Sequence, residues 1–112
     1  LESVRYFLMR EIPFDNDGDY SESKFEVRFN ADLANGLGNL TNRVLSMVVK
    51  YSDSEVPKVK NVNNDLIKYL TDEIWPEYQK NMDKWRFDRA LESTWKFITY
   101  CDQLISDKNR GQ

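Results

Sequence analysis

The sequence contains no histidine and a single cysteine, Cys101, among its 112 residues. Without these side chains the chain can build neither a cysteine–histidine zinc cluster nor a nucleophile activated by histidine. One cysteine also rules out a disulfide within the chain and is typical of a reducing compartment. No glycine-rich phosphate loop follows a strand pattern. We therefore expect no catalytic residue, no metal site and no cofactor in this chain.

Glycine and proline are scarce as well, with four and three residues, which argues against long structureless loops. No apolar run approaches the roughly 20 residues of a membrane span, and no signal peptide is visible, so we expect no membrane partner. The composition, 40% hydrophobic and 31% charged, is that of one globular domain or a piece of one. A net charge of −3 is weak evidence against a broad basic surface for nucleic acid.

An acidic turn precedes the longest helical pattern. Asp15, Asp17 and Asp19 alternate as in a calcium loop, but such a loop needs glycine at its sixth position, where this chain has Tyr20. We therefore interpret the stretch as a turn that leads to Ser21, a helix N-cap with an acidic residue after it.

The thirty residues from Ser21 to Lys50 form the dominant pattern of the chain. Their apolar residues recur at steps of three and four, which predicts one long α-helix that fades near Tyr51. The series is Phe25, Phe29, Leu33, Leu37, Leu40, Val44, Met47 and Val48. We expect Leu37, Leu40 and Val44 to face the core.

A polar series runs beside this apolar face: Asn35, Asn39 and Arg43 are each four residues apart. Gly36 and Gly38 lie between them, although glycine inside a helix costs about 1 kcal/mol relative to alanine. Two such residues suggest a close approach, for instance of another backbone. From the residues alone, the favoured interpretation is a core helix with this flank in solvent.

Three further helices complete the expected architecture. Leu1 to Glu11 is a short helix that ends before Pro13. A second helix begins at Asn63 or Asn64, with a kink or break near Trp75 because Pro76 follows. The last helix runs from about Phe87 to Ile105, with Cys101 as a small buried residue on its apolar stripe. The sequence predicts an all-α protein whose helices pack as an antiparallel bundle.

Three stretches then resemble the bacterial type of methionyl-tRNA synthetase. RYFLMREIPFDNDGDYS, residues 5–21, is similar to the family's region that contacts the tRNA stem. FNADLANGLGNLTNRVLSMV, residues 29–48, is similar to the first long helix of its anticodon-binding bundle. RFDRALESTWKFI, residues 86–98, resembles a later helix of that bundle. The three occur in the family's order and together cover nearly the whole chain.

The resemblance implies two parts: residues 1–20 as the end of the stem-contact region, and residues 21–112 as an anticodon-binding bundle of the class I synthetase type, truncated at its C-terminus. In the family an asparagine and an arginine, four apart on the long helix, contact the CAU anticodon. They match Asn39 and Arg43, and Asn35 is a further candidate one turn earlier. The family's Pro-Trp contact would follow the last helix, where this chain ends in DKNRGQ.

For the parent protein, the resemblance implies a methionine–tRNA ligase that uses ATP and, where a zinc-bearing insertion is present, zinc. Its partners would be the initiator and elongator methionine tRNAs and its own catalytic domain, which is missing here, and not DNA. Its location would be the cytoplasm or, alternatively, the mitochondrial matrix. Without that domain, Leu1 to Asp19 would be mobile, repacked on the bundle or used in self-association.

Two rival hypotheses stay open. One is the related bundle of another class I synthetase, such as the cysteine or leucine enzyme, against which the REIPF and DGD sequences argue. The other is a helical protein-interaction module that binds no RNA. A test of tRNA binding would separate this interaction module from the two synthetase hypotheses.

Overall fold

The computed structural model describes residues 1–12, 20–56 and 64–110, with side chains as far as Asp107. Nearly all of these residues are helical and none is in a strand, so the all-α prediction is confirmed. Residues 13–19 of the acidic turn and the last two residues of the chain lie outside the described part. In order, the elements are α1 Glu2–Glu11, α2 Glu22–Arg28, η1 Phe29–Gly38, α3 Asn39–Tyr51, α4 Asn64–Tyr69, η2 Leu70–Ile74, α5 Trp75–Asp83 and α6 Phe87–Arg110.

The long helix begins as the sequence predicts. Ser21 is its N-cap: the backbone is extended there, and the Ser21 hydroxyl accepts a hydrogen bond from the Lys24 N–H at 3.4 Å. Glu22 follows in the first turn, where the helix dipole favours a negative charge. The segments α2, η1 and α3 then form one continuous helix that ends at Tyr51.

The middle of this helix is wider than the sequence suggests, because η1 has π-helical geometry. The N–H of Asn39, for example, bonds back to the carbonyl of Ala34, five residues earlier. A Cβ on Gly38 would lie 2.9 Å from the Leu33 carbonyl oxygen. A Cβ on Gly36 would lie 3.2 Å from the Ala31 carbonyl oxygen and 3.4 Å from an indole nitrogen. The close neighbours of both glycines are thus carbonyls of their own widened turns and one side chain, not a second backbone.

The second long helix runs through the proline without a break. Its three segments α4, η2 and α5 follow one another from Asn64 to Asp83, with Pro76 in the first turn of α5. A proline ring collides with the carbonyl four residues earlier, which here belongs to Asp72. The π-helical turn η2, Leu70–Ile74, contains that carbonyl. The break that we considered does not occur, and the turn just before Pro76 is widened.

A tight turn reverses the chain between α5 and α6. Trp85 has a positive φ of 60°, and the buried Asn81 accepts the Arg86 N–H at 2.8 Å through its carbonyl. Arg86 also donates two hydrogen bonds to Asp88, at 3.1 and 3.0 Å, in the first turn of α6. These hydrogen bonds hold the pKa of Asp88 below its usual value.

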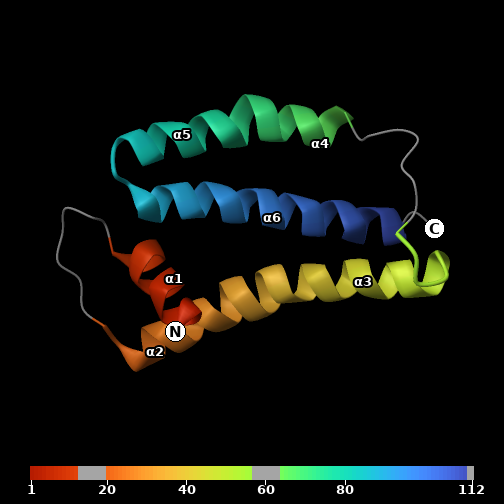
Figure 1. Ribbon diagram of the computed structural model, residues 1–112, viewed down its shortest axis with the longest axis horizontal. Helices are drawn as coiled ribbons and strands as arrows, with labels where there is room; N and C mark the ends of the chain where they lie inside the picture. The colour runs from red at the N-terminus through yellow and green to blue at the C-terminus, as the bar shows by residue number, and fades with distance from the viewer. Residues whose placement is uncertain (13–19, 57–63, 111–112) are drawn as a thin grey trace.

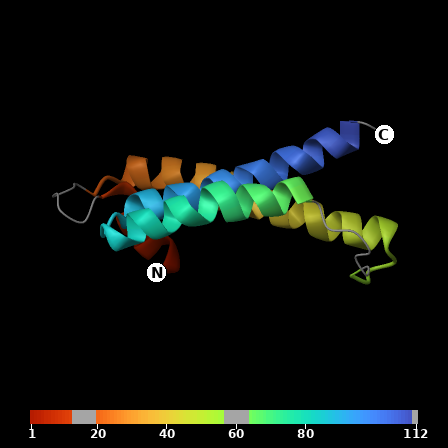
Figure 2. The same cartoon turned by 90° about the horizontal axis from the view of Figure 1, so that it is seen from above.

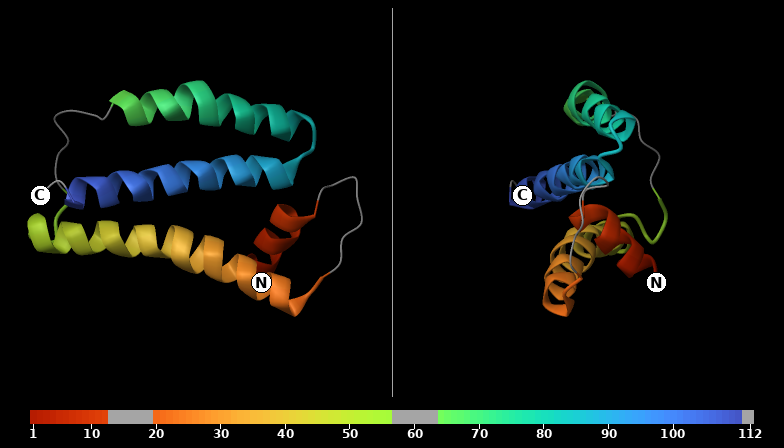
Figure 3. Two further views of the ribbon diagram at one scale, coloured as in Figure 1. Left: turned by 180° about the vertical axis from the view of Figure 1, so that it is seen from behind. Right: turned by 90° about the vertical axis from the view of Figure 1, so that its left-hand side faces the viewer.

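The three long helices form a layer with α6 in the middle (Figure 1). Successive helices run in opposite directions, so α6 is antiparallel to α4–α5 and parallel to the long helix, and the bundle prediction is confirmed. Helix α1 packs on α6 and on the first half of the long helix, as the end-on view shows (Figure 3). Seen from above, α3 and α6 diverge toward their C-terminal ends (Figure 2).

This layer has a thin core. The buried apolar side chains among the described residues are Phe7, Ile74 and Ala90. The accessible surface is 8672 Å², whereas a compact monomer of 13.3 kDa exposes about 6,500 Å². Apolar side chains therefore remain at the surface on several helices, including Leu45, Val49 and Trp75.

Candidate nucleic-acid interface

One residue, Asp32 on η1, joins three helices through its carboxylate and its backbone carbonyl. It accepts a 2.6 Å hydrogen bond from the Tyr6 hydroxyl of α1 and a 3.3 Å bond from Arg28. Its backbone oxygen accepts a 2.8 Å bond from the indole N–H of Trp95 on α6. The Tyr6 and Trp95 rings also lie against each other, with centroids 4.6 Å apart. We refer to these four residues together with Arg10 as the Asp32 cluster.

The electrostatics of the cluster follow from its burial. Partial burial first, and then the hydrogen bond to Asp32, raise the pKa of Tyr6. Burial alone would lower the pKa of Arg28, but its bonds to Glu11, at 2.9 and 3.1 Å, and to Asp32 raise it. Arg10 is less well paired: its Nε is buried, lies 4.0 Å from Asp32 and makes no hydrogen bond.

The cluster fixes the leading segment, for which the sequence left three outcomes open. Helix α1 is packed on the bundle, and its Phe7 is only 1% exposed. The Phe7 ring meets Tyr20 and Phe25 edge-on, at 5.9 and 5.7 Å between centroids. Leu8 and Met9 still face outward, so α1 keeps an uncovered apolar side.

The three predicted anticodon contacts are all exposed. Asn35 lies in η1, Asn39 is the first residue of α3, and Arg43 follows one turn later. In the described part of the chain neither asparagine amide makes a side-chain hydrogen bond, so both amides can bind an outside ligand.

Arg43 differs from the two asparagines because α6 holds it in place. Its Nη1 donates to the carboxylate of Asp102 and to the hydroxyl of Ser106, both at 2.9 Å. The arginine side chain is 47% exposed, so this is not a buried ion pair. A guanidinium has five N–H donors, and these two bonds use the pair on Nη1. Nη2 and Nε therefore have no partner among the described residues and present a flat, oriented edge.

The apolar neighbours of Arg43 are less buried than we expected. Leu37 is 42% and Val44 41% exposed, while Leu40 is half-buried. The prediction that all three face a core is wrong for Leu37 and Val44, because α3 and α6 diverge and little packs on this part of α3. Cys101 is likewise only partly buried, and this burial raises the pKa of its thiol.

The described residues show no group of acidic, cysteine or histidine side chains that could hold a metal ion. None of the helices in that part of the chain has the length and apolar character of a membrane span.

Comparison with known proteins finds related sequences and structures. The sequence model described as "tRNA synthetases class I (M)" matches residues 1–45. The methionine–tRNA ligase of Listeria monocytogenes is 37% identical over 110 residues, which are 96% of this chain and 17% of the relative. That of Fusobacterium nucleatum is 39% identical over 109 residues, again 96% of this chain and 17% of the relative.

The solved structures identify the family. Apo methionyl-tRNA synthetase of Mycobacterium tuberculosis superposes with a TM-score of 0.82 at 36% identity, covering 96% of this chain and 22% of that one. The same enzyme bound to methionyl-adenylate matches equally well. The chain belongs to the methionyl-tRNA synthetase family. It spans about a sixth of the length of the curated relatives it matches.

Within this methionyl-tRNA synthetase segment, sequence reasoning missed Asp102 and Ser106, the two residues that hold Arg43. They are four apart on α6 and beside the apolar stripe of Cys101 and Ile105, which is a signal for a shared polar flank. This spacing does not identify Arg43 as the residue that they bind, because Arg43 lies 59 residues before Asp102 in the sequence.

Proposed function

We propose that this chain is the anticodon-reading part of a methionine–tRNA ligase, with residues 1–20 from the stem-contact region and residues 21–112 from the helical bundle. The parent enzyme would join methionine to its initiator and elongator tRNAs with ATP. It would act in the cytoplasm or the mitochondrial matrix, and any zinc would belong to its catalytic half.

The observation that carries the proposal is the orientation of Arg43. RNA sequence is read mainly on unstacked loop bases, through hydrogen bonds to their edges and stacking on aromatic or guanidinium planes. Asp102 and Ser106 fix one nitrogen of Arg43 and leave the opposite edge for a base. Asn39, one turn earlier and exposed, offers both a donor and an acceptor from one amide. Asn35 would extend the same flank toward η1.

The test compares Arg43→Ala with a matched control in the full-length enzyme. We expect Arg43→Ala to lower kcat/KM for native methionine tRNA by the equivalent of about 1–3 kcal/mol, and much less for a tRNA with an altered anticodon. A contact to a base carries sequence information, whereas a contact to phosphate does not. Arg89→Ala removes another exposed arginine, on α6, and should change neither value.

Equal losses for both tRNAs would show that Arg43 only positions the backbone. No loss for either tRNA would refute anticodon reading by this helix and favour the rival, a protein-interaction module that binds no RNA. A filter-binding measurement of the enzyme with tRNA would then test that rival directly.

A further inference from the structure

Two kinds of contact join α1 to the long helix. The Phe7 ring, 1% exposed, packs edge-on against a phenylalanine ring of α2, and such apolar burial brings the helices together without fixing a direction. Hydrogen bonds do fix a direction, because they weaken steeply when they are bent. Tyr6 on α1 donates to Asp32 on η1 at 2.6 Å. Arg28 on α2 donates to Glu11 on α1 at 2.9 and 3.1 Å, so the angle of α1 is fixed at two points.

The two polar links are connected to each other. Arg28 also donates to the Asp32 carboxylate at 3.3 Å, so the guanidinium that holds Glu11 contacts the carboxylate that holds Tyr6. The side chains of Arg28 and Asp32 are 28% and 15% exposed, and salt screens such a partly buried pair less than a surface pair. The Asp32 cluster and Glu11 therefore form one network between α1 and the long helix.

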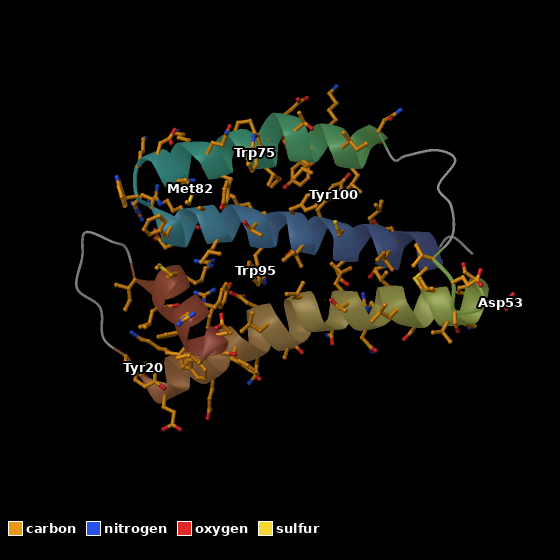
Figure 4. The ribbon with its side chains drawn as sticks, in the orientation of Figure 1. Tyr20, Asp53, Trp75, Met82, Trp95 and Tyr100 are labelled. Carbon is orange, nitrogen blue, oxygen red and sulfur yellow. The ribbon has the colours of Figure 1, made fainter. Side chains whose placement is uncertain are left out.

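Helix α6 braces the same network through Trp95, which Figure 4 shows directed toward the long helix. The indole N–H of Trp95 donates to the Asp32 carbonyl at 2.8 Å, and its ring lies 4.6 Å from that of Tyr6. Further along, α6 holds the long helix again where Arg43 bonds to Asp102. The same helix thus supports both Asp32 and Arg43, so α1 and the free edge of Arg43 keep one relative orientation.

We propose that Asp32 is a positioning residue for the ligase reaction: it fixes the angle between α1 and the long helix, so that a tRNA read at Arg43 also fits the stem-contact region. This inference rests on the proposed function, which assigns α1 to that region and Arg43 to the anticodon. Asp32 acts through its neighbours, because its carboxylate is already bonded to Tyr6 and Arg28. A substrate displaced by about 1 Å can react about 100-fold more slowly, so a looser angle should slow catalysis more than it weakens binding.

The experiment separates tRNA binding from methionyl transfer in the full-length enzyme. Tyr6→Phe removes the 2.6 Å hydrogen bond and keeps the ring. We expect the single-turnover rate of methionyl transfer from preformed adenylate to tRNA to fall about fivefold or more, while the Kd for tRNA changes less than about twofold. Adenylate formation, measured by pyrophosphate exchange without tRNA, should be unchanged. Trp95→Phe, which removes the indole donor and keeps an aromatic ring, should act in the same direction.

Two control variants separate positioning from stability. Ile74 is 7% exposed on η2, a segment that contributes no residue to the Asp32 cluster. Ile74→Val and Ile74→Ala should lower the melting temperature by a smaller and a larger amount than Tyr6→Phe, and both should transfer methionine at the rate of the unmodified enzyme. A transfer rate that falls with the melting temperature in the Ile74 variants as well would make the loss in Tyr6→Phe a general effect of stability and overturn the inference.

Combining Tyr6→Phe with Arg43→Ala tests whether the Asp32 cluster acts through anticodon reading. Residues that serve one function have non-additive effects, so Tyr6→Phe should lower kcat/KM little further once Arg43 is replaced. Fully additive losses would show that the cluster acts independently of Arg43, and the inference would be wrong.

The two proposals fail in different ways. If Arg43→Ala discriminates anticodons while Tyr6→Phe and Trp95→Phe transfer methionine normally, the proposed function stands and Asp32 has no positioning role. If Arg43→Ala is without effect on either tRNA, the proposed function fails first and this inference with it.

Discussion

The two halves of the long helix, α2 with η1 and then α3, differ in how they are held. In the first half, Asp32 on η1 is bonded to side chains from α1, α2 and α6, and α1 buries Phe7 against Phe25. At the α3 end, the contact to α6 is mainly the Arg43 ion pair, and Leu45 and Val49 are 60% and 62% exposed. The first half is therefore held by many contacts, whereas the second half leaves most of its side chains exposed. Asn39 and Arg43, two of the proposed anticodon contacts, begin where the dense packing stops.

The sharpest way to test this difference is to truncate one apolar side chain at each end. Phe7→Ala should lower the free energy of unfolding by about 3–5 kcal/mol, because it empties the most buried aromatic site. Leu45→Ala should change it by less than about 0.5 kcal/mol, since Leu45 already faces solvent. Urea unfolding followed by circular dichroism measures both. Similar losses at the two sites would contradict the comparison.

The pH dependence of stability should also arise around Asp32 on η1, in the first half of the long helix. The pKa of Tyr6 is raised above its ordinary 10.0 by burial and by Asp32. A group whose pKa is higher in the folded state contributes stability that is complete below the unfolded pKa and is lost as pH rises through the folded value. We therefore expect the chain to become less stable from about pH 10 upward.

Tyr6→Phe is the matching variant. It should cost about 1.5–3 kcal/mol at neutral pH, the usual range for a hydrogen bond to a charged group, and should reduce the loss above pH 10. Melting temperatures between pH 7 and pH 11 give both results. An unchanged alkaline slope in the variant would assign that loss to other groups, of which Cys101 is one because its pKa is raised as well.

A smaller effect than that of Phe7→Ala or Tyr6→Phe is expected at Gly38, where η1 meets α3. Replacing an ordinary helical glycine with alanine stabilises a helix by about 1 kcal/mol. Here the new Cβ would lie 2.9 Å from the Leu33 carbonyl oxygen, so Gly38→Ala should instead destabilise the chain by a similar amount. Gly36→Ala, with 3.2 Å as its tightest contact, should be milder. Thermal unfolding of the two variants decides, and a stabilised Gly38→Ala would mean that the wide turn relaxes without cost.

Much of this fold could be predicted because it depends on local patterns. Ser21 marks the start of the long helix, and the spacing of three and four gives the helices around it. The π-helical turns were not predictable, because Leu33, Leu37 and Leu40 have the spacing of an ordinary α-helix and give no sign of a wider turn. Pro76 and the two glycines indicated where the helices are irregular, but not that the irregularity is a π-helical turn.

The candidate site divides in the same way. The exposure of Asn39 and Arg43 follows from their place on a polar flank, which is a property of one helix. The bonds from Arg43 to Asp102 and from Asp32 to Tyr6 and Trp95 depend on how distant segments meet, 59, 26 and 63 residues apart. Likewise, Val44 has the spacing of a core residue, but its burial depends on whether another helix covers it.

The widened turns of η1 also set the rotational phase of everything after them. Each residue of an α-helix turns the chain by about 100°, so a turn that holds one residue more resets the direction of all later side chains. Asn39 and Arg43 stand directly beyond this adjustment, whereas Asp32 stands within it. A deletion of one residue between Asp32 and Asn39 would leave the start of the helix in place and aim Arg43 about a quarter-turn away from Asp102. The widened turns of η1 therefore set the direction in which Arg43 meets Asp102 on α6.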